Sequence, residues 1–217
     1  MRICIGFDKR ETVAYHVLTN SIMRHSSGPV EFIPINRRNI PEFTRGMEDG
    51  STEFSFSRFL TPYLSGYKGH SVFMDCDMLV RCDIYELLDY VGFNDVAVVK
   101  HDYTPKDSDK FLGNKQHAYP KKNWSSLMVF NNWRQPVKRL TPEVVNTASG
   151  KYLHQFEWAQ RVGEIPRSYN HLVGEYPEHP GARIIHYTLG TPCFKGYENQ
   201  EWSKEWFQEM ERMLHAD

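Results

Sequence analysis

Short apolar runs alternate with stretches of helical periodicity along this chain. Apolar side chains that recur three and four positions apart predict amphipathic helices over residues 9–25, 56–64 and 83–88, from residue 141 onward, and from about residue 199 to the end. The alternation predicts an α/β domain with a mixed, mostly parallel sheet that carries helices on both faces. The runs with the length and character of buried strands occupy residues 3–7, 30–35, 71–74, 95–100, 127–130 and 183–187.

The first predicted helix has recognisable boundaries. Asp8 precedes it and Glu11 follows three residues later, which is the spacing of a capping box. Two polar stretches, residues 36–54 and 101–123, lack periodicity and are predicted to be long loops. Loops of that length in a compact domain are usually functional or mobile, so both are candidate binding segments.

Composition limits the class of protein. The 217 residues fit one domain over 1–217, and 40% hydrophobic with 24% charged residues is an ordinary globular balance. A net charge of −1 without a basic run argues against a nucleic-acid partner, which needs a concentrated basic face. The four cysteines form no C-x-x-C pair and are expected to be reduced. No stretch has the length of a signal peptide's apolar region or of a membrane span, which predicts a cytoplasmic protein.

The strongest chemical signal is VFMDCDML, residues 72–79. Asp75 and Asp77 are two positions apart, so their carboxylates project to one side of an extended segment at the end of an apolar strand. Two like charges in that place are unfavourable unless a cation or substrate compensates them. Hard oxygen ligands suit Mg²⁺ or Mn²⁺, which bridge the phosphates of nucleotide sugars. The alternative interpretation is an acidic turn with a helix-capping role.

A second signal lies near the C-terminus. His186 ends an apolar run and leads into TLGTPCFKGY, in which Gly190 allows tight turning and Lys195 supplies a cation. An imidazole is a reasonable third ligand for Mn²⁺, and a lysine can neutralise a diphosphate leaving group. The alternative is that His186 is a hydrogen-bonded structural residue.

Taken in order, the segments Phe7-Asp8, SRFLTPYL, MDCDMLV, WSSLMVFNN and HYTLGTPCFKGY resemble the GT-A glycosyltransferases of the glycogenin-like (family 8-type) group, and more narrowly its small bacterial and phage members. The resemblance covers roughly residues 1 to 200. It implies a Rossmann-like GT-A fold and a hexosyltransferase-type enzyme that uses Mn²⁺ or Mg²⁺. The expected donor is a UDP-sugar, the acceptor is a carbohydrate or another hydroxyl compound, and the expected outcome is retention of anomeric configuration.

The resemblance also implies residue roles. It places the metal on Asp75, Asp77 and His186, and the uridine on the strand end at the N-terminus. Arg58 occupies the place of a basic residue that approaches the donor. The residues expected to contact the metal or the donor are Gly6, Phe7, Asp8, Arg58, Asp75, Cys76, Asp77, His186, Gly190 and Lys195.

Three catalytic candidates depart from the family pattern or have another interpretation. Family members carry a lysine six residues after the metal histidine, whereas Lys195 follows His186 by nine. The Asp-Gln pair that faces the transferred sugar in glycogenin has no clean match, and Glu157 in HQFEWAQ is the nearest candidate. Asp102, which follows the predicted strand at residues 95–100, either accepts hydrogen bonds from sugar hydroxyls or is a turn residue.

Two other functions remain as alternatives. One is a nucleotide-sugar-binding protein that no longer catalyses transfer. The other is a sugar nucleotidyltransferase, which would carry a glycine-rich basic loop after the first strand, where this chain has FDKRETVAYH. The short chain leaves room for a partner or a second copy of itself to help bind the acceptor.

Overall fold

The computed structural model describes residues 1–46, 52–105 and 120–215. Within them, one sheet has six strands in the order β2-β1-β3-β6-β5-β7. Strand β6 is antiparallel to both neighbours, while the other pairs are parallel, so the predicted mixed, mostly parallel sheet is confirmed. The strands are β1 (Arg2–Gly6), β2 (Glu31–Ile35), β3 (His70–Met74), β5 (Val96–Val98), β6 (Leu127–Asn131) and β7 (Val162–Glu164).

The central strands are buried on both faces, which explains why their sequences are continuously apolar rather than alternating. Pro34 lies in β2, at the edge of the sheet, where a residue without a backbone N–H is tolerated.

A second, smaller sheet was not anticipated from the sequence. It has the order β4-β9-β8 and consists of β4 (Met78–Val80), β9 (Ile184–His186) and β8 (His171–Leu172). Only three residues separate the end of β3 from the start of β4, so the chain passes directly from the large sheet to the small one. β4 and β9 are antiparallel, with Met78 opposite His186.

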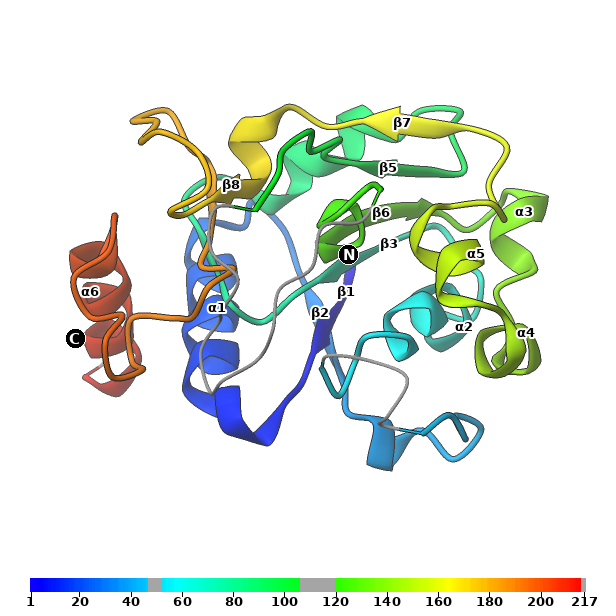
Figure 1. Ribbon diagram of the computed structural model, residues 1–217, viewed down its shortest axis with the longest axis horizontal. Helices are drawn as coiled ribbons and strands as arrows, with labels where there is room; N and C mark the ends of the chain where they lie inside the picture. Colours follow the sequence, from blue (N-terminus) through cyan, green and yellow to red (C-terminus); the bar gives the residue numbers. More distant parts are fainter. Residues whose placement is uncertain (47–51, 106–119, 216–217) are drawn as a thin grey trace.

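Helices flank the large sheet on both sides (Figure 1). On one side, α1 (Thr12–His25) packs against β4 and against α6 (Ser203–Leu214). The short helices on the other side are α2 (Thr61–Leu64), α3 (Gln135–Lys138), α4 (Pro142–Thr147) and α5 (Gly150–His154). The 3-10 helices are Lys9–Glu11, Arg37–Asn39, Ser57–Leu60, Ile84–Tyr90, Trp124–Ser126 and Arg167–Asn170.

Several predicted helices and loops differ in detail. The helices predicted over 56–64 and 83–88 are largely 3-10 in form. Asp8 accepts a hydrogen bond from the backbone N–H of Arg10, but in the described residues the buried side chain of Glu11 does not make the return bond to the N–H of Asp8 that would complete a capping box. The predicted loops 36–54 and 101–123 include residues 47–51 and 106–119, which lie outside the described residues.

Two separate apolar clusters hold the fold together. The main core fills the space around the six-stranded sheet. The small core lies between α1, the three-stranded sheet and α6, and its members are Val17, Leu79, Val173, Ala182, Ile185, Tyr187 and Trp206.

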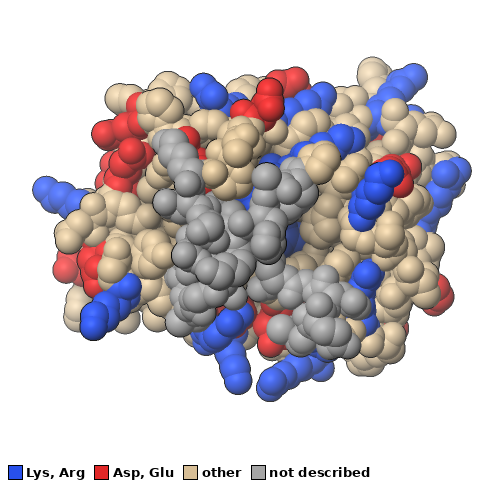
Figure 2. Space-filling model, in the orientation of Figure 1, with Lys and Arg blue, Asp and Glu red and all other residues tan. Residues whose placement is uncertain are grey.

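The cysteines and the surface add two details. All four cysteines are free, and Cys193 alone of the four is exposed. Basic and acidic side chains are interspersed over the face shown in Figure 2. Among the described residues, no helix combines the length and the apolar character needed to cross a membrane.

Candidate active site

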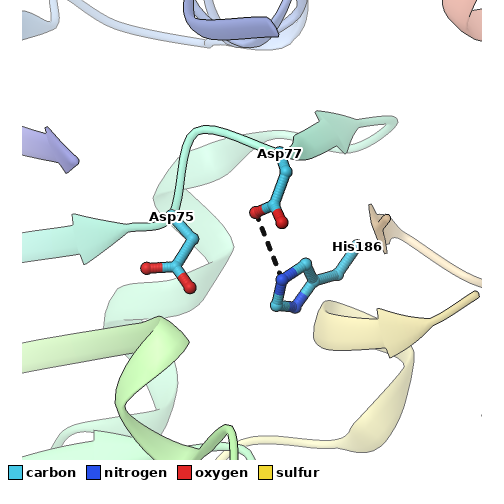
Figure 3. A group of neighbouring side chains, drawn as sticks. All are labelled: Asp75, Asp77 and His186. Atoms are coloured by element: carbon cyan, nitrogen blue, oxygen red, sulfur yellow. Dashed lines mark ion pairs between the residues drawn. The ribbon is translucent and has the colours of Figure 1, made fainter. Parts of the chain in front are cut away.

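Three side chains from three strand ends converge at the carboxyl edge of β3 (Figure 3). Asp75 follows β3, Asp77 precedes β4 and His186 ends β9. One ligand atom of each lies within 4.8 Å of the others, and Nε2 of His186 is 3.2 Å from Oδ1 of Asp77. The histidine is buried, whereas the two carboxylates are 16% and 14% exposed. Each carboxylate therefore keeps a small accessible surface, although its Oδ1 atom is buried.

Backbone pairing places these side chains. The N–H of Tyr187 donates to the carbonyl of Asp77 at 2.9 Å, which extends the β4–β9 ladder and brings His186 beside Asp77. The N–H of Asp75 donates to the carbonyl of Ser126 at 2.9 Å, which ties the end of β3 to the start of β6. The spacing of the three groups is thus set by strand register.

Arg58 is built into the site as a partner of Asp75. Its Nη1 lies 3.0 Å from Oδ1 of Asp75 and donates to the carbonyl of Ser125 at 2.9 Å. Its Nε donates to the carbonyl of Phe54 at 3.3 Å, and the whole side chain is buried. The guanidinium therefore fixes the orientation of Asp75 and offsets its charge.

Glu11 is a functional candidate that the sequence did not reveal. It is 4% exposed, and its Oε1 has no hydrogen-bond partner among the described residues. Burial, together with the negative charges of Asp77, Asp8 and Asp75, raises the pKa of Glu11 to about 8. The sequence indicated only a capping role for Glu11. Its position three residues after Asp8 is the same whether it caps the helix or lies buried beside the other carboxyl groups.

Asp8 has a different environment from Glu11. Burial acts to raise the pKa of Asp8, but hydrogen bonds from the Arg10 side chain and backbone outweigh it and hold the pKa below its usual value. Asp8 is therefore an ionised carboxylate paired with Arg10, whose Nε lies 3.0 Å from Oδ1.

The residues present fit a divalent cation. Three carboxylates, Asp8, Asp75 and Asp77, act electrostatically on Glu11, and the described cations that pair with these groups by a salt bridge are Arg10 and Arg58. An excess of hard oxygen donors beside an imidazole is the donor set of Mn²⁺, and the oxygens alone suit Mg²⁺. A cation at Asp75, Asp77 and His186 would also relieve the repulsion that acts on Glu11.

The N-terminal strand end has a packing role of its own. A Cβ added to Gly6 would lie 2.4 Å from the ring of Phe54, so the strand needs glycine at this point. Phe7 is half-buried and packs edge-on against Tyr15, with ring centroids 5.5 Å apart. Their expected contact with a nucleotide stays a prediction.

Cys76 lies between the two aspartates in sequence, but its side chain belongs to the main core. Burial raises the pKa of its thiol well above the usual value. Only the backbone of Cys76 is therefore suited to contact a donor.

The other predicted residues are not among the three converging side chains. Asp102, Glu157 and Lys195 are exposed, and Glu157 is 3.3 Å from Nζ of Lys151. Gly190 has a φ of 150° and closes the turn after β9 by donating from its N–H to the carbonyl of Tyr187 at 2.8 Å. The roles proposed for these residues stay predictions.

One sequence relative covers nearly the whole chain. Protein CDI of Arabidopsis thaliana is 42% identical over 223 residues, a match that spans 97% of this chain and 86% of the plant protein. No protein-family model matches the chain.

Solved glycosyltransferase structures share the fold at low sequence identity. The WbbM bifunctional glycosyltransferase is 18% identical, with a TM-score of 0.66 over 97% of this chain and 49% of WbbM. GlyE of Streptococcus pneumoniae is 12% identical, with a TM-score of 0.64 over 96% of this chain and 59% of GlyE. The chain therefore spans only about half the length of these two proteins.

A third structure matches over almost its full length. The galactosyltransferase LgtC, in complex with donor and acceptor sugar analogs, is 12% identical, with a TM-score of 0.61 over 100% of this chain and 98% of LgtC. Identities this low show the fold and not the chemistry, so the expected GT-A fold is confirmed, while the narrower glycogenin-like group stays a prediction. The sequence match is close and covers most of both chains, and the protein therefore belongs to the same family as Protein CDI of Arabidopsis thaliana.

Proposed function

We propose that this protein is a metal-dependent glycosyltransferase of the hexosyltransferase type. The observation that carries the proposal is the convergence of Asp75, Asp77 and His186 at the carboxyl end of β3 in a GT-A fold. In open α/β sheets, ligands bind outside the carboxyl ends of the strands, which is where this group lies. The fold neighbours WbbM, GlyE and LgtC are themselves glycosyltransferases, and LgtC was solved with donor and acceptor sugar analogs.

The proposed donor is a UDP-sugar, and the proposed acceptor is a hydroxyl group of a carbohydrate or another compound. Asp75, Asp77 and His186 would hold Mn²⁺ or Mg²⁺, which as a Lewis acid stabilises negative charge on departing UDP. Arg58 holds Asp75 in place through their 3.0 Å ion pair. A carboxylate fixed before the substrate arrives does not have to reorganise during the reaction.

Other residues have proposed roles around the donor. Gly6, Phe7 and Asp8 would border the uridine, and Asp102 would accept hydrogen bonds from sugar hydroxyls. Lys195 would add positive charge beside the diphosphate, and Glu157 is the candidate to face the transferred sugar. The acceptor hydroxyl would attack the anomeric carbon with retention of configuration.

The test is isothermal titration of the protein with UDP, with and without Mn²⁺. Asp77→Asn is the informative variant, because it removes a ligand charge while the buried Arg58 keeps its partner Asp75. Asp89→Asn, which changes an exposed aspartate away from the group, is the matched control. Circular dichroism establishes that each variant is folded.

We expect UDP binding to depend on Mn²⁺ in the wild type and the control, and to weaken at least tenfold in Asp77→Asn. The proposal would be contradicted if the folded wild-type protein showed no Mn²⁺-dependent binding of UDP, GDP or CDP. Incubation with UDP-sugars then distinguishes an enzyme from a nucleotide-sugar-binding protein, because only the enzyme releases UDP by transfer or slow hydrolysis.

A further inference from the structure

We propose that Asn170, itself oriented by Ser126, is a positioning residue that holds His186 as the Nδ1–H tautomer, so that the bare Nε2 faces Asp77. This inference rests on the metal site of the proposed function. It concerns a residue that does not touch the cation.

A chain of three hydrogen bonds carries the inference; the bonds of Asn170 to His186 and to Ser126 are buried, and the bond of Ser126 to Asn123 is partly buried. Nδ1 of His186 lies 2.9 Å from Oδ1 of Asn170, and Nδ2 of Asn170 lies 2.8 Å from Oγ of Ser126. Oγ of Ser126 donates to the backbone carbonyl of Asn123 at 2.7 Å. Asn170, Ser126 and His186 are each at most 1% exposed, so water does not replace these partners.

The hydroxyl proton of Ser126 determines which atom donates in each of these hydrogen bonds. The carbonyl of Asn123 accepts only, so Ser126 uses its single hydroxyl proton there. Ser126 must then accept from Asn170, which requires the NH₂ group of the amide to face the serine. The amide oxygen therefore faces His186, and Nδ1 of the imidazole must carry the proton.

The tautomer has a consequence at Asp77. A neutral imidazole carries one N–H, so its Nε2 presents a lone pair toward the carboxylate oxygen 3.2 Å away. Two acceptors at that distance repel each other unless a cation or a proton lies between them. The second hydrogen-bonding partner of a metal-bound histidine commonly fixes the ring in this way, and its loss weakens metal binding 10- to 100-fold.

Ser126 also connects the two halves of the group. Its side chain orients Asn170 and hence His186, while its carbonyl accepts the backbone N–H of Asp75 at 2.9 Å. A single buried serine thus positions ligands that come from both sheets.

The direct test is ¹⁵N NMR of the histidine rings in metal-free protein at alkaline pH, where the imidazoles are neutral. The spectrum of His186→Gln assigns the signal of His186. We expect the Nδ1–H form in the wild type and in Asn170→Asp, which keeps an oxygen opposite Nδ1. We expect a mixture or the Nε2–H form in Asn170→Leu.

The second readout is the affinity for Mn²⁺ alone, measured by electron paramagnetic resonance of the free ion. We expect Asn170→Leu to bind Mn²⁺ 10- to 100-fold more weakly than the wild type. The matched control is Asn132→Leu. Asn132 is also fully buried and also bonds a serine, Ser71, but it follows the end of β6, whereas Ser126 precedes the start of that strand. That control should change the affinity by less than about twofold. If Asn170→Leu does not fold, Ser126→Ala releases the amide and is expected to mix the tautomers.

The outcomes separate this inference from the proposed function. An Nε2–H ring in the wild type, or an unchanged tautomer in both Asn170→Leu and Ser126→Ala, overturns the inference. A wild-type Nδ1–H ring in a protein that does not bind Mn²⁺ contradicts the proposed metal site and supports the assignment of Asn170.

Discussion

The two cores of this protein differ in size and in what they hold. The main core surrounds a six-stranded sheet and carries Asp75 at the end of β3. The small core has seven buried members and supports a sheet whose strands are only two or three residues long, yet it carries both Asp77 and His186. One candidate metal ligand therefore belongs to the large sheet and its main core, and the other two belong to the small sheet and its small core.

This difference indicates that the small sheet is the part on which the geometry of the candidate metal site depends most. Short strands have little stability of their own and depend on the helices that pack against them. α1 and α6 supply that support on the small sheet. We therefore expect the positions of Asp77 and His186 to be more sensitive to packing defects than the position of Asp75.

The largest expected effect comes from removing an aromatic side chain from either core. Trp206→Ala in the small core and Phe130→Ala in the main core each delete a fully buried side chain. Each should lower the free energy of unfolding by about 3–5 kcal/mol, measured by denaturant titration. Only Trp206→Ala should also weaken Mn²⁺ binding by the protein that remains folded, because Phe130 lies opposite Ser71, at the far end of β3.

A conservative change provides the control for this comparison. Nε1 of Trp206 is buried without a hydrogen-bond partner in the described residues, so Trp206→Phe removes an unsatisfied donor and keeps most of the volume. It should change the unfolding free energy by less than about 1.5 kcal/mol. Equal losses of Mn²⁺ affinity in Trp206→Ala and Phe130→Ala would show that the two cores are not independent.

The next effect is the pH dependence of stability that Glu11 introduces. Its pKa in the folded state is about 8 against an ordinary 4.5, so the folded protein binds this proton more tightly than the unfolded chain. The stabilising contribution is complete below about pH 4.5 and is lost as the pH rises through about 8. For one titrating group, the free energy of unfolding changes by at most about 1.4 kcal/mol per pH unit.

Glu11→Gln removes this proton and should flatten the stability profile between those pH values. The variant should be more stable than the wild type at pH 8 in the absence of metal. Mn²⁺ should reduce the difference, because a cation favours the ionised form of Glu11. Parallel stability profiles for wild type and variant would contradict the assigned pKa.

A smaller effect is expected at Asp95, which precedes β5 at the end of the main sheet opposite to Asp75. Asp95 is fully buried, lies 2.9 Å from Nε of Arg134 and accepts from the backbone N–H groups of Gln160 and Arg161 at 2.8 and 2.9 Å. Asp95→Asn turns one acceptor into a donor and should lower the unfolding free energy by about 1–3 kcal/mol. The affinity for Mn²⁺ should stay within about twofold, and a larger change would show coupling across the sheet.

The smallest effect on stability is expected at Glu157, whose carboxylate is exposed and paired with Lys151. Glu157→Gln should change the unfolding free energy by less than about 0.5 kcal/mol, since exposed ion pairs contribute little. Once a donor is identified, the kcat of the Glu157→Gln variant decides whether Glu157 takes part in the reaction. A fall of about 100-fold with unchanged stability would assign Glu157 to the chemistry, and an unchanged kcat would remove it.

The sequence predicted those parts of the molecule whose signal is local. Strands β1, β3 and β6 are continuous apolar runs, and Asp75 and Asp77 directly follow one of them. His186 was also found because it ends a recognisable run. In each case the residue and its structural context are neighbours in the chain.

Features that depend on distant partners were not predicted. β4 and β8 are too short for any periodicity and exist because β9 pairs with both of them. Asn170 and Ser126 are 44 residues apart, and neither carries a pattern that points to the other. Glu11 had the spacing of a capping residue, and only the approach of Asp75 and Asp77 gives it another role.

The pairing of Met78 with His186 also bears on how such a protein can diversify. The ligand spacing depends on one antiparallel register and not on the length of the connections that precede β9. Lengthening a surface connection adds only a slowly growing entropic penalty, so segments between β6 and β9 can lengthen without displacing the histidine. Under the proposed function, a sheet edge that holds the metal ligands in fixed register, joined by connections of variable length, would let related proteins acquire new acceptors by insertion without a change in how the donor is bound.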